Sequence, residues 1–223
     1  MFDKKWNDEI YLRNKQINKY PYDWVVSRVN RYFSKNIKYL KKETALELGS
    51  GTGNNLKFLS EFGFGKVEGV EGSIKAVQYA SDFLQKIEGI QIFNLDFINL
   101  PMEDEKYIFC LDRGSITHNS IPDIEQTLNE VYRVLKPGGY FFSAMFSSNH
   151  SQLSYSKKFD NYVLSFADIM GVKDGIKASF FQKKDIYSLF SKFEIVEFIH
   201  EMNINFINEK SSTAMWNIVA KKN

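Results

Sequence analysis

The stretch Ala45-Leu46-Glu47-Leu48-Gly49-Ser50-Gly51-Thr52-Gly53 decides the fold of this chain. Its apolar first half predicts a buried strand, and a helix is predicted to follow from Asn54 to about Phe62. Glycines at alternating positions let the backbone approach a ligand that a Cβ atom would exclude. The helix N-terminus adds unpaired N–H groups at the same place. The stretch therefore predicts a site for a nucleotide-like cofactor, with the Glu47 carboxylate aimed at it.

The spacing of the glycines distinguishes this loop from the dinucleotide fingerprint. In G-x-G-x-x-G the third glycine follows the second by three residues. Here Gly53 follows Gly51 by only two, and an acid, Glu47, stands two residues before Gly49. This tighter pattern resembles the S-adenosylmethionine loop of class I methyltransferases.

Length and composition limit the kind of protein. With 223 residues, of which 43% are hydrophobic and 25% charged, the chain suits one α/β domain with a polar surface. The net charge of +2 comes without a basic stripe, so no nucleic-acid partner is expected. No apolar run is long enough to cross a membrane, and we expect a cytoplasmic monomer or homodimer without a membrane partner. The single cysteine, Cys110, argues against disulfides and a cysteine metal cluster, so no metal is expected.

Strands and helices alternate along residues 44–145. Strands are predicted at Thr44–Leu48, Lys66–Glu71, Ile90–Leu95, Tyr107–Leu111 and Tyr140–Met145. Helices are predicted between them at 54–62, 73–87 and 123–135, with a turn at 137–139 before the last strand. This alternation predicts a parallel sheet with helices on both faces.

Four carboxylates stand at the ends of four predicted strands: Glu47, Glu71, Asp96 and Asp112. In parallel sheets, ligands bind beyond the carboxyl ends of the strands, so these acids are expected to meet at one site. An acid at a strand end can instead cap the next helix, and this alternative stays open for Glu71, Asp96 and Asp112.

Two aromatic-rich stretches flank this core. Residues 1–43 predict a helical extension, with an amphipathic helix from Asp23. Residues 146–181 predict a long insertion with a helix at Lys157–Met170. A connection of this length more often forms a lid or binding loop than a connecting loop without a function. Either the two stretches cap a substrate pocket, or they only cover the sheet. The aromatic residues that would line such a pocket are Trp6, Tyr11, Tyr20, Tyr22, Trp24, Phe146, Tyr155, Phe159 and Tyr162.

The last part of the chain, residues 182–223, is predicted to complete the sheet. A helix is expected near Gln182–Phe190. Two strand-like runs, Phe193–Met202 and Thr213–Lys221, are close enough in sequence to form an antiparallel hairpin.

Five sequence blocks carry a family likeness: ELGSGTGNN, GVEGS, NLDFINLP, LDRGS and LKPGGYFF. In this order and spacing they resemble the small-molecule branch of class I S-adenosylmethionine-dependent methyltransferases. The likeness covers about residues 44–145, and the WNIVAKK ending fits it as well. It implies a Rossmann-like three-layer α/β sandwich with a seven-stranded, mostly parallel sheet whose last strand is antiparallel. It also implies that residues 1–223 form a single methyltransferase domain.

The resemblance further implies how the cofactor, S-adenosylmethionine, is held. Glu71 matches the acid that takes both ribose hydroxyls. Asp96 matches the acid that reaches the adenine amino group, with Phe97 beside the ring, and Asp112 lies on the methionine side. The residues that match this site or lie within its motifs are Glu47, Gly49, Ser50, Gly51, Gly53, Asn54, Glu71, Gly72, Asp96, Phe97 and Asp112.

Transfer of a methyl group to a hydroxyl benefits from a general base, and histidine is the usual one near neutral pH. His118, after the fourth strand, is the first candidate, although it can instead pack locally; His150, at the start of the insertion, is the second. Arg113 is a candidate either to hold an anionic group of the substrate or to pair with Asp112. Tyr20 and Tyr22 are candidates to line the substrate pocket.

The N-terminal stretch WNDEIYLRNKQINKYPYDWVV resembles methyltransferases of bacterial surface-sugar pathways. This likeness implies in-line O-methylation of a sugar or a related small metabolite. Two alternatives stay open. In the first, the chain is a non-catalytic protein that binds S-adenosylmethionine and acts through partners. In the second, it is a nicotinamide-dependent oxidoreductase with a similar sheet.

Overall fold

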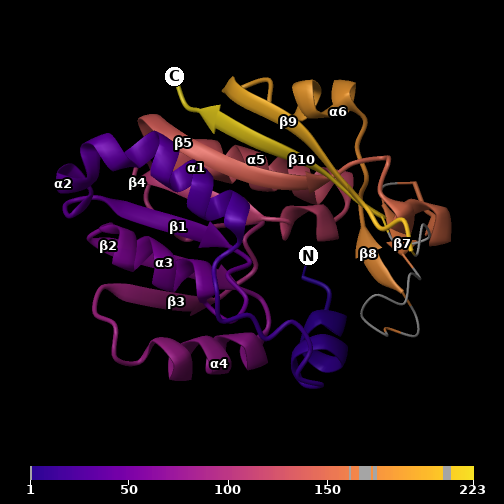
Figure 1. Ribbon diagram of the computed structural model, residues 1–223, viewed down its shortest axis with the longest axis horizontal. Helices are drawn as coiled ribbons and strands as arrows, with labels where there is room; N and C mark the ends of the chain where they lie inside the picture. The colour runs from indigo at the N-terminus through magenta and orange to yellow at the C-terminus, as the bar shows by residue number, and fades with distance from the viewer. Residues whose placement is uncertain (1, 161, 166–171, 173–174, 208–211) are drawn as a thin grey trace.

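A seven-stranded sheet runs through the centre of the computed structural model, which describes residues 2–160, 162–165, 172, 175–207 and 212–223 (Figure 1). The strand order is β3-β2-β1-β4-β5-β10-β9. Strands β1 to β5 pair in parallel, whereas β10 is antiparallel to both β5 and β9. The predicted topology is therefore confirmed. The strands are β1 (Thr44–Leu48), β2 (Lys66–Glu71), β3 (Ile90–Asn94), β4 (Tyr107–Arg113), β5 (Leu135–Phe146), β9 (Glu194–Ile204) and β10 (Ser212–Lys221).

Helices cover both faces of this sheet and make three layers (Figure 1). On one face, α1, α3 and α4 pack against the sheet, and on the other face α5 and α6 do so. The helices are α1 (Asp23–Phe33), α2 (Ile37–Leu40), α3 (Asn54–Phe62), α4 (Ile74–Leu84), α5 (Ile121–Val134) and α6 (Lys183–Leu189). Shorter turns are the π-helix η1 (Trp6–Tyr11) and the 3-10 turns η2 (Ser34–Asn36), η3 (Ile116–His118) and η4 (Ser151–Tyr155).

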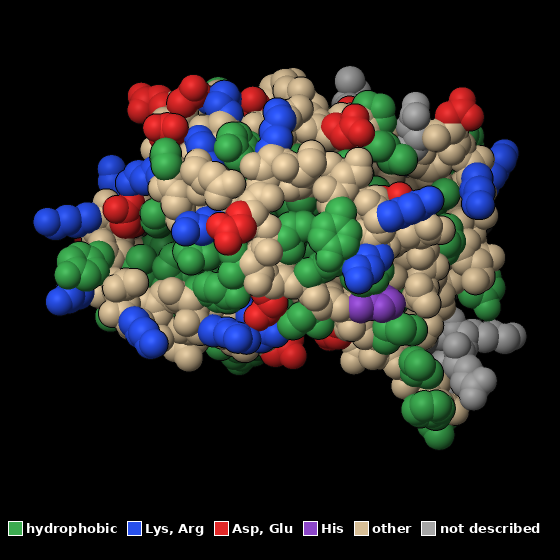
Figure 2. Space-filling model, turned by 90° about the horizontal axis from the view of Figure 1, so that it is seen from above, with side chains coloured by type: hydrophobic (Ala, Val, Ile, Leu, Met, Phe, Trp, Pro, Cys, Tyr) green, Lys and Arg blue, Asp and Glu red, His purple; other side chains and the backbone are tan. Residues whose placement is uncertain are grey.

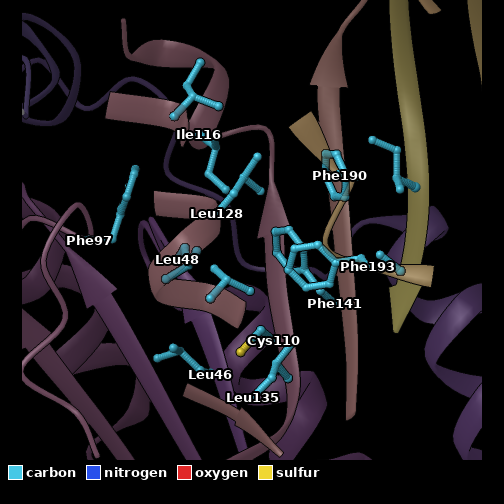
Figure 3. Packing of buried hydrophobic residues seen from close by; sticks show 14 of the residues in the cluster. Leu46, Leu48, Phe97, Cys110, Ile116, Leu128, Leu135, Phe141, Phe190 and Phe193 are labelled. Atoms are coloured by element: carbon cyan, nitrogen blue, oxygen red, sulfur yellow. The ribbon is translucent and has the colours of Figure 1, made fainter. Parts of the chain in front are cut away.

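The central strands are apolar on both sides because both faces of the sheet are buried. Successive side chains along a strand point to opposite faces. Cys110 and Phe141 therefore lie in the core beneath α5 and α6 (Figure 3). Their neighbours Phe109 and Phe142 lie in the other core, where their rings meet edge to face with centroids 4.8 Å apart.

Strand β5 begins earlier than predicted. It starts at Leu135, so the expected turn at 137–139 lies within the strand. Gly138 has φ +77°, and its N–H donates to the carbonyl of Lys222 (2.8 Å). The pairing with β4 shifts register between Tyr107 and Phe109, which absorbs the irregularity.

The insertion after β5 forms a second, three-stranded sheet, β6 (Ser156–Lys158), β7 (Val163–Ser165) and β8 (Ile176–Ala178). The helix predicted at Lys157–Met170 is therefore wrong wherever the structure describes it; residues 161 and 166–170 lie outside the described residues. Strand β7 pairs antiparallel with both neighbours, so backbone groups that a helix would pair locally are paired between strands.

The insertion and the N-terminal segment touch each other. Ile10 of η1 packs with Val172 and Ile176. The Lys5 ammonium donates to the carbonyl of Gly175 (2.8 Å). These two segments, far apart in the sequence, therefore form one cover.

The surface mixes charges of both signs. On the face shown in Figure 2, acidic and basic side chains lie interspersed among apolar ones. No helix in the described part of the chain combines the length and the apolar character that a bilayer crossing needs.

Candidate active site

A pocket of about 340 Å³ lies at the carboxyl ends of the parallel strands. The glycine-rich loop after β1 forms one side, and the strand ends after β2, β3 and β4 form its floor. The N-terminal segment, the loop after β5 and the β9–β10 hairpin form the rest. The predicted site residues that line it are Tyr22, Glu47, Gly49, Ser50, Gly51, Asn54, Glu71, Gly72, Asp96, Phe97, Arg113, His118 and His150.

The glycine loop has a backbone that other residues seldom adopt. Gly49, Gly51 and Gly53 have φ of +62°, +53° and +84°. At Gly49, a Cβ atom would lie 2.1 Å from the Ser115 hydroxyl oxygen, and that hydroxyl donates to the Gly49 carbonyl (3.1 Å). The missing side chain thus lets the loop lie against the end of β4.

Glu47 is a buried acid, and one of its two carboxylate oxygens has no hydrogen-bond partner. Its Oε1 accepts from the Asn55 amide (2.6 Å), while its Oε2 is buried without a partner. Burial, with smaller contributions from the nearby Asp112 and Glu71 carboxylates, raises the pKa of Glu47 to about 8, and the hydrogen bond from Asn55 opposes the rise. The Ser50 hydroxyl of the glycine loop is also buried and unpartnered. Orphaned acceptors that line a pocket fit a ligand that carries a cationic amine.

Glu71 connects the glycine loop to α4. Its Oε2 accepts from the N–H of Gly51 (2.9 Å), and its Oε1 accepts from the N–H of Ser73 (2.8 Å). Burial raises its pKa, and these N–H groups oppose the rise. Each carboxylate oxygen has a further lone pair, so Glu71 can still accept from a ligand.

The end of β3 meets the N-terminal segment. Asp96 Oδ2 accepts from the N–H of Phe2 (2.7 Å). The Phe2 ring lies so close to Gly72 that a Cβ atom there would come within 2.2 Å of it. Phe97, which is buried, lines the pocket beside Asp96.

Three predicted site residues lie elsewhere. Gly53 faces Leu84 of α4 and does not line the pocket. Asp112 is fully buried and accepts from the N–H groups of Ser115 (2.7 Å) and Ile116 (3.0 Å), so the capping alternative describes it. Tyr20 is 85% exposed and does not line the pocket, although its carbonyl accepts from the Asn54 amide (2.9 Å).

Arg113 points into the pocket rather than toward Asp112. Its guanidinium carbon lies 4.4 Å from the centre of the Tyr22 ring, a cation–π contact. Its Nε is buried without a hydrogen-bond partner. Asp112 accepts from the Ser143 hydroxyl (2.8 Å), and the Arg113 charge acts on Asp112 by opposing the rise in pKa that burial causes, without a hydrogen bond between the two described side chains.

Two histidines stand beside the same aromatic ring. The Phe146 ring lies 5.2 Å from the ring of His118 and 4.9 Å from that of His150, centre to centre. Nδ1 of His118 lies 3.0 Å from the carbonyl oxygen of Lys177 in β8, and Nδ1 of His150 accepts from the N–H of Gln152 (3.2 Å). Burial lowers the pKa of each to about 4.

The aromatic residues of the flanking stretches divide into two groups. Trp6, Tyr11, Tyr22 and Phe146 line the pocket. Those that do not line it are Trp24, which packs in the core beneath α1, and Tyr155, Phe159 and Tyr162 of the insertion.

Some lining residues carried no sequence signal. Phe2 and Asp3, and Glu201, Asn203, Thr213 and Met215 of the β9–β10 hairpin, reach the pocket only through the fold. Within the described ranges, no group of three or more His, Cys, Asp or Glu side chains is arranged to hold a metal ion.

Solved structures share this architecture. A structure from Methanosarcina mazei described as a SAM-dependent methyltransferase superposes with a TM-score of 0.64 at 20% identity, over 81% of this chain and 92% of that chain. A Burkholderia thailandensis N1-methyltransferase with bound S-adenosylhomocysteine superposes with a TM-score of 0.62 at 15% identity, over 97% and 80% of the two chains. Residues 45–139 match the family model described as a methyltransferase domain. The family-model match and the shared fold together support a class I, S-adenosylmethionine-dependent methyltransferase.

Curated relatives match only part of the length of this chain. EEF1A lysine methyltransferase 2 from Homo sapiens is 30% identical over 125 residues, which are 52% of this chain and 52% of the relative. The matches span between a quarter and about half of the length of the first relatives. By their names, the relatives methylate acceptors as different as lysine, sterols and arsenite.

Proposed function

We propose that this methyltransferase O-methylates a small molecule, a sugar or a related metabolite, with His118 as general base. The observation that carries the proposal is the cover over the pocket. Trp6 and Tyr11 of η1 line the pocket, and η1 packs against the insertion through Ile10 and Ile176. A pocket of about 340 Å³ under such a cover suits a small acceptor and excludes water from the reaction.

The cofactor end is assigned from the family resemblance, together with the unpartnered oxygen of Glu47. We assign the unpartnered Oε2 of Glu47 to the cofactor's amino group. Glu71 takes the ribose hydroxyls, Asp96 takes the adenine amino group, and Phe97 lies against the adenine ring. When bound, S-adenosylmethionine supplies a methyl group already activated by the sulfonium charge, so the protein has chiefly to position the acceptor.

His118 is placed to take the acceptor's proton. Its Nδ1 is held by the Lys177 carbonyl, which leaves Nε2 free to accept the hydroxyl proton as the new C–O bond forms. The lowered pKa of about 4 keeps His118 neutral at pH 7. Arg113, with its buried and unpartnered Nε, is assigned to an anionic group of the acceptor.

Two measurements test this function. Calorimetry is expected to show that S-adenosylhomocysteine binds and that NAD(P)H does not; the reverse would favour an oxidoreductase. Transfer of labelled methyl groups is then measured on a panel of sugars and small hydroxy compounds. His118→Asn is expected to lower kcat about 100-fold and to leave the S-adenosylhomocysteine Kd unchanged.

The control is His200→Asn, which changes an exposed histidine on β9 outside the pocket lining. Transfer that His118→Asn leaves at the wild-type rate would overturn the assignment of the base. Tight binding of S-adenosylhomocysteine without transfer to any compound of the panel would favour a non-catalytic binding protein.

A further inference from the structure

The acceptor end of the pocket contains two imidazoles whose protons are fixed by the backbone. His118 belongs to η3 after β4, and His150 immediately precedes η4 after β5. Both line the pocket, and both pack against Phe146. Their positions bring them within reach of one small molecule.

The partner of His118 determines its tautomer. Nδ1 lies 3.0 Å from the carbonyl oxygen of Lys177. A carbonyl oxygen can only accept a hydrogen bond, so the proton of the neutral ring is on Nδ1. Nε2 of His118 therefore presents a lone pair.

The partner of His150 determines the opposite tautomer. Nδ1 lies 3.2 Å from the backbone nitrogen of Gln152, which donates to it. Since an N–H can only donate, Nδ1 of His150 carries the lone pair and Nε2 carries the proton. Neither Nε2 has a hydrogen-bond partner among the described residues.

The surroundings keep both rings neutral. Burial is the main cause of the low pKa of each, and a positive charge on His150 would lower the pKa of His118 further. Asp3 is the acidic side chain that opposes this at His118, and Trp6 and Phe146 pack against the His118 ring. The pocket thus presents one nitrogen acceptor and one N–H donor at neutral pH.

We propose that His118 and His150 act as an acceptor–donor pair that selects an acceptor molecule with two neighbouring oxygens. The hydroxyl to be methylated donates its proton to Nε2 of His118, and the second oxygen accepts from Nε2–H of His150. Vicinal diols, hydroxy ketones and hydroxy acids have this arrangement, and simple alcohols lack it. The proposal rests on the proposed O-methylation and adds His150 as the residue that determines specificity.

The tautomers are measurable without any acceptor. In protein labelled with ¹⁵N-histidine, long-range ¹H–¹⁵N spectra distinguish protonated from unprotonated ring nitrogens, and the chain has only three histidines. His118→Asn and His150→Asn assign the signals. At pH 7.5 we expect Nδ1–H for His118 and Nε2–H for His150. The same tautomer in both rings, the reverse assignment, or averaged shifts would overturn the pair.

A matched pair of variants tests specificity on every compound that the panel shows to be methylated. His150→Phe keeps a ring against Phe146 and Phe180 but removes the donor, while His150→Gln keeps a donor. Each compound is compared with its analogue lacking the second oxygen. We expect wild type and His150→Gln to prefer the complete compound through KM by about tenfold or more, and His150→Phe to lose that preference.

The outcomes separate the two proposals. Wild-type enzyme that methylates the deoxy analogues equally well overturns the pair, and so does a preference that persists in His150→Phe. Opposite tautomers in a protein that methylates nothing in the panel refute the proposed function while supporting the fixed donor and acceptor.

Discussion

The backbone N–H of Phe2 donates a 2.7 Å hydrogen bond to Oδ2 of Asp96, 94 residues further along the chain. The N-terminal segment is therefore hydrogen-bonded to the carboxylate that we assign to the adenine amino group. Asp96→Asn replaces one acceptor oxygen by a donor, and is expected to weaken S-adenosylhomocysteine binding about tenfold. Calorimetry measures the Kd. Asp82→Asn, an exposed acid on α4, is the control, and an equal Kd in both variants would contradict the adenine assignment.

Glu47 predicts proton release on cofactor binding. Its pKa of about 8 means that it is protonated at pH 7 in the free protein. A bound cationic amine favours the carboxylate, so at pH 7 binding of S-adenosylhomocysteine is expected to release up to about one proton. The observed binding enthalpy should then vary with the ionisation enthalpy of the buffer. In Glu47→Gln this dependence is expected to disappear, whereas in Glu103→Gln, an exposed acid, it should persist.

Gly49 in the glycine loop and Gly138 in β5 allow a matched comparison of the steric cost of an added Cβ atom. Gly49→Ala and Gly138→Ala both place a Cβ on a backbone with positive φ, +62° and +77°. Around Gly138 nothing lies within 4 Å of that Cβ, while at Gly49 it would meet the Ser115 hydroxyl at 2.1 Å. We expect Gly138→Ala to cost about 1 kcal/mol of unfolding free energy, and Gly49→Ala at least about 2 kcal/mol more. Urea denaturation measures both, and equal losses would refute the steric argument.

The lowered pKa values of His118 and His150 predict that the folded state loses stability as the pH falls. Their pKa values are lowered from 6.5 to about 4, so between these values the unfolded chain binds protons that the folded chain does not. The stability that they contribute is complete above pH 6.5 and is lost as the pH falls to about 4. Each accounts for about 3 kcal/mol at most. Tm measured from pH 7 to pH 4 should fall less steeply in His150→Phe than in wild type or His200→Asn.

The pH dependence of kcat should follow the protonation of His118. His118 must be neutral to accept a proton, so kcat is expected to stay level from pH 8 down to about 5 and to fall as the ring becomes protonated near pH 4. A decline centred near pH 6.5 would indicate a solvent-exposed base instead.

Much of the fold could be predicted because it depends on short-range patterns. The run from Thr44 to Phe62 predicted β1, the loop and α3 at the bounds that the structure shows. The helix predicted at Lys157–Met170 was wrong, since the short strands β6, β7 and β8 have no strong period and depend on pairing with each other. Asp112 shows the same limit at the site, because a strand-end acid can face a ligand or cap a turn with an identical local sequence.

The sequence alone determined the sheet and the cofactor loop, since side-chain period and positive φ depend only on neighbouring residues. Tertiary structure decided the acceptor end. The Lys177 carbonyl, 59 residues beyond His118, fixes the proton of that ring. Strands β9 and β10 and the N-terminal residues Phe2 and Asp3 line the pocket from opposite ends of the sequence. A histidine's chemistry follows from the group that its ring nitrogen meets, and only the folded chain brings that group to it.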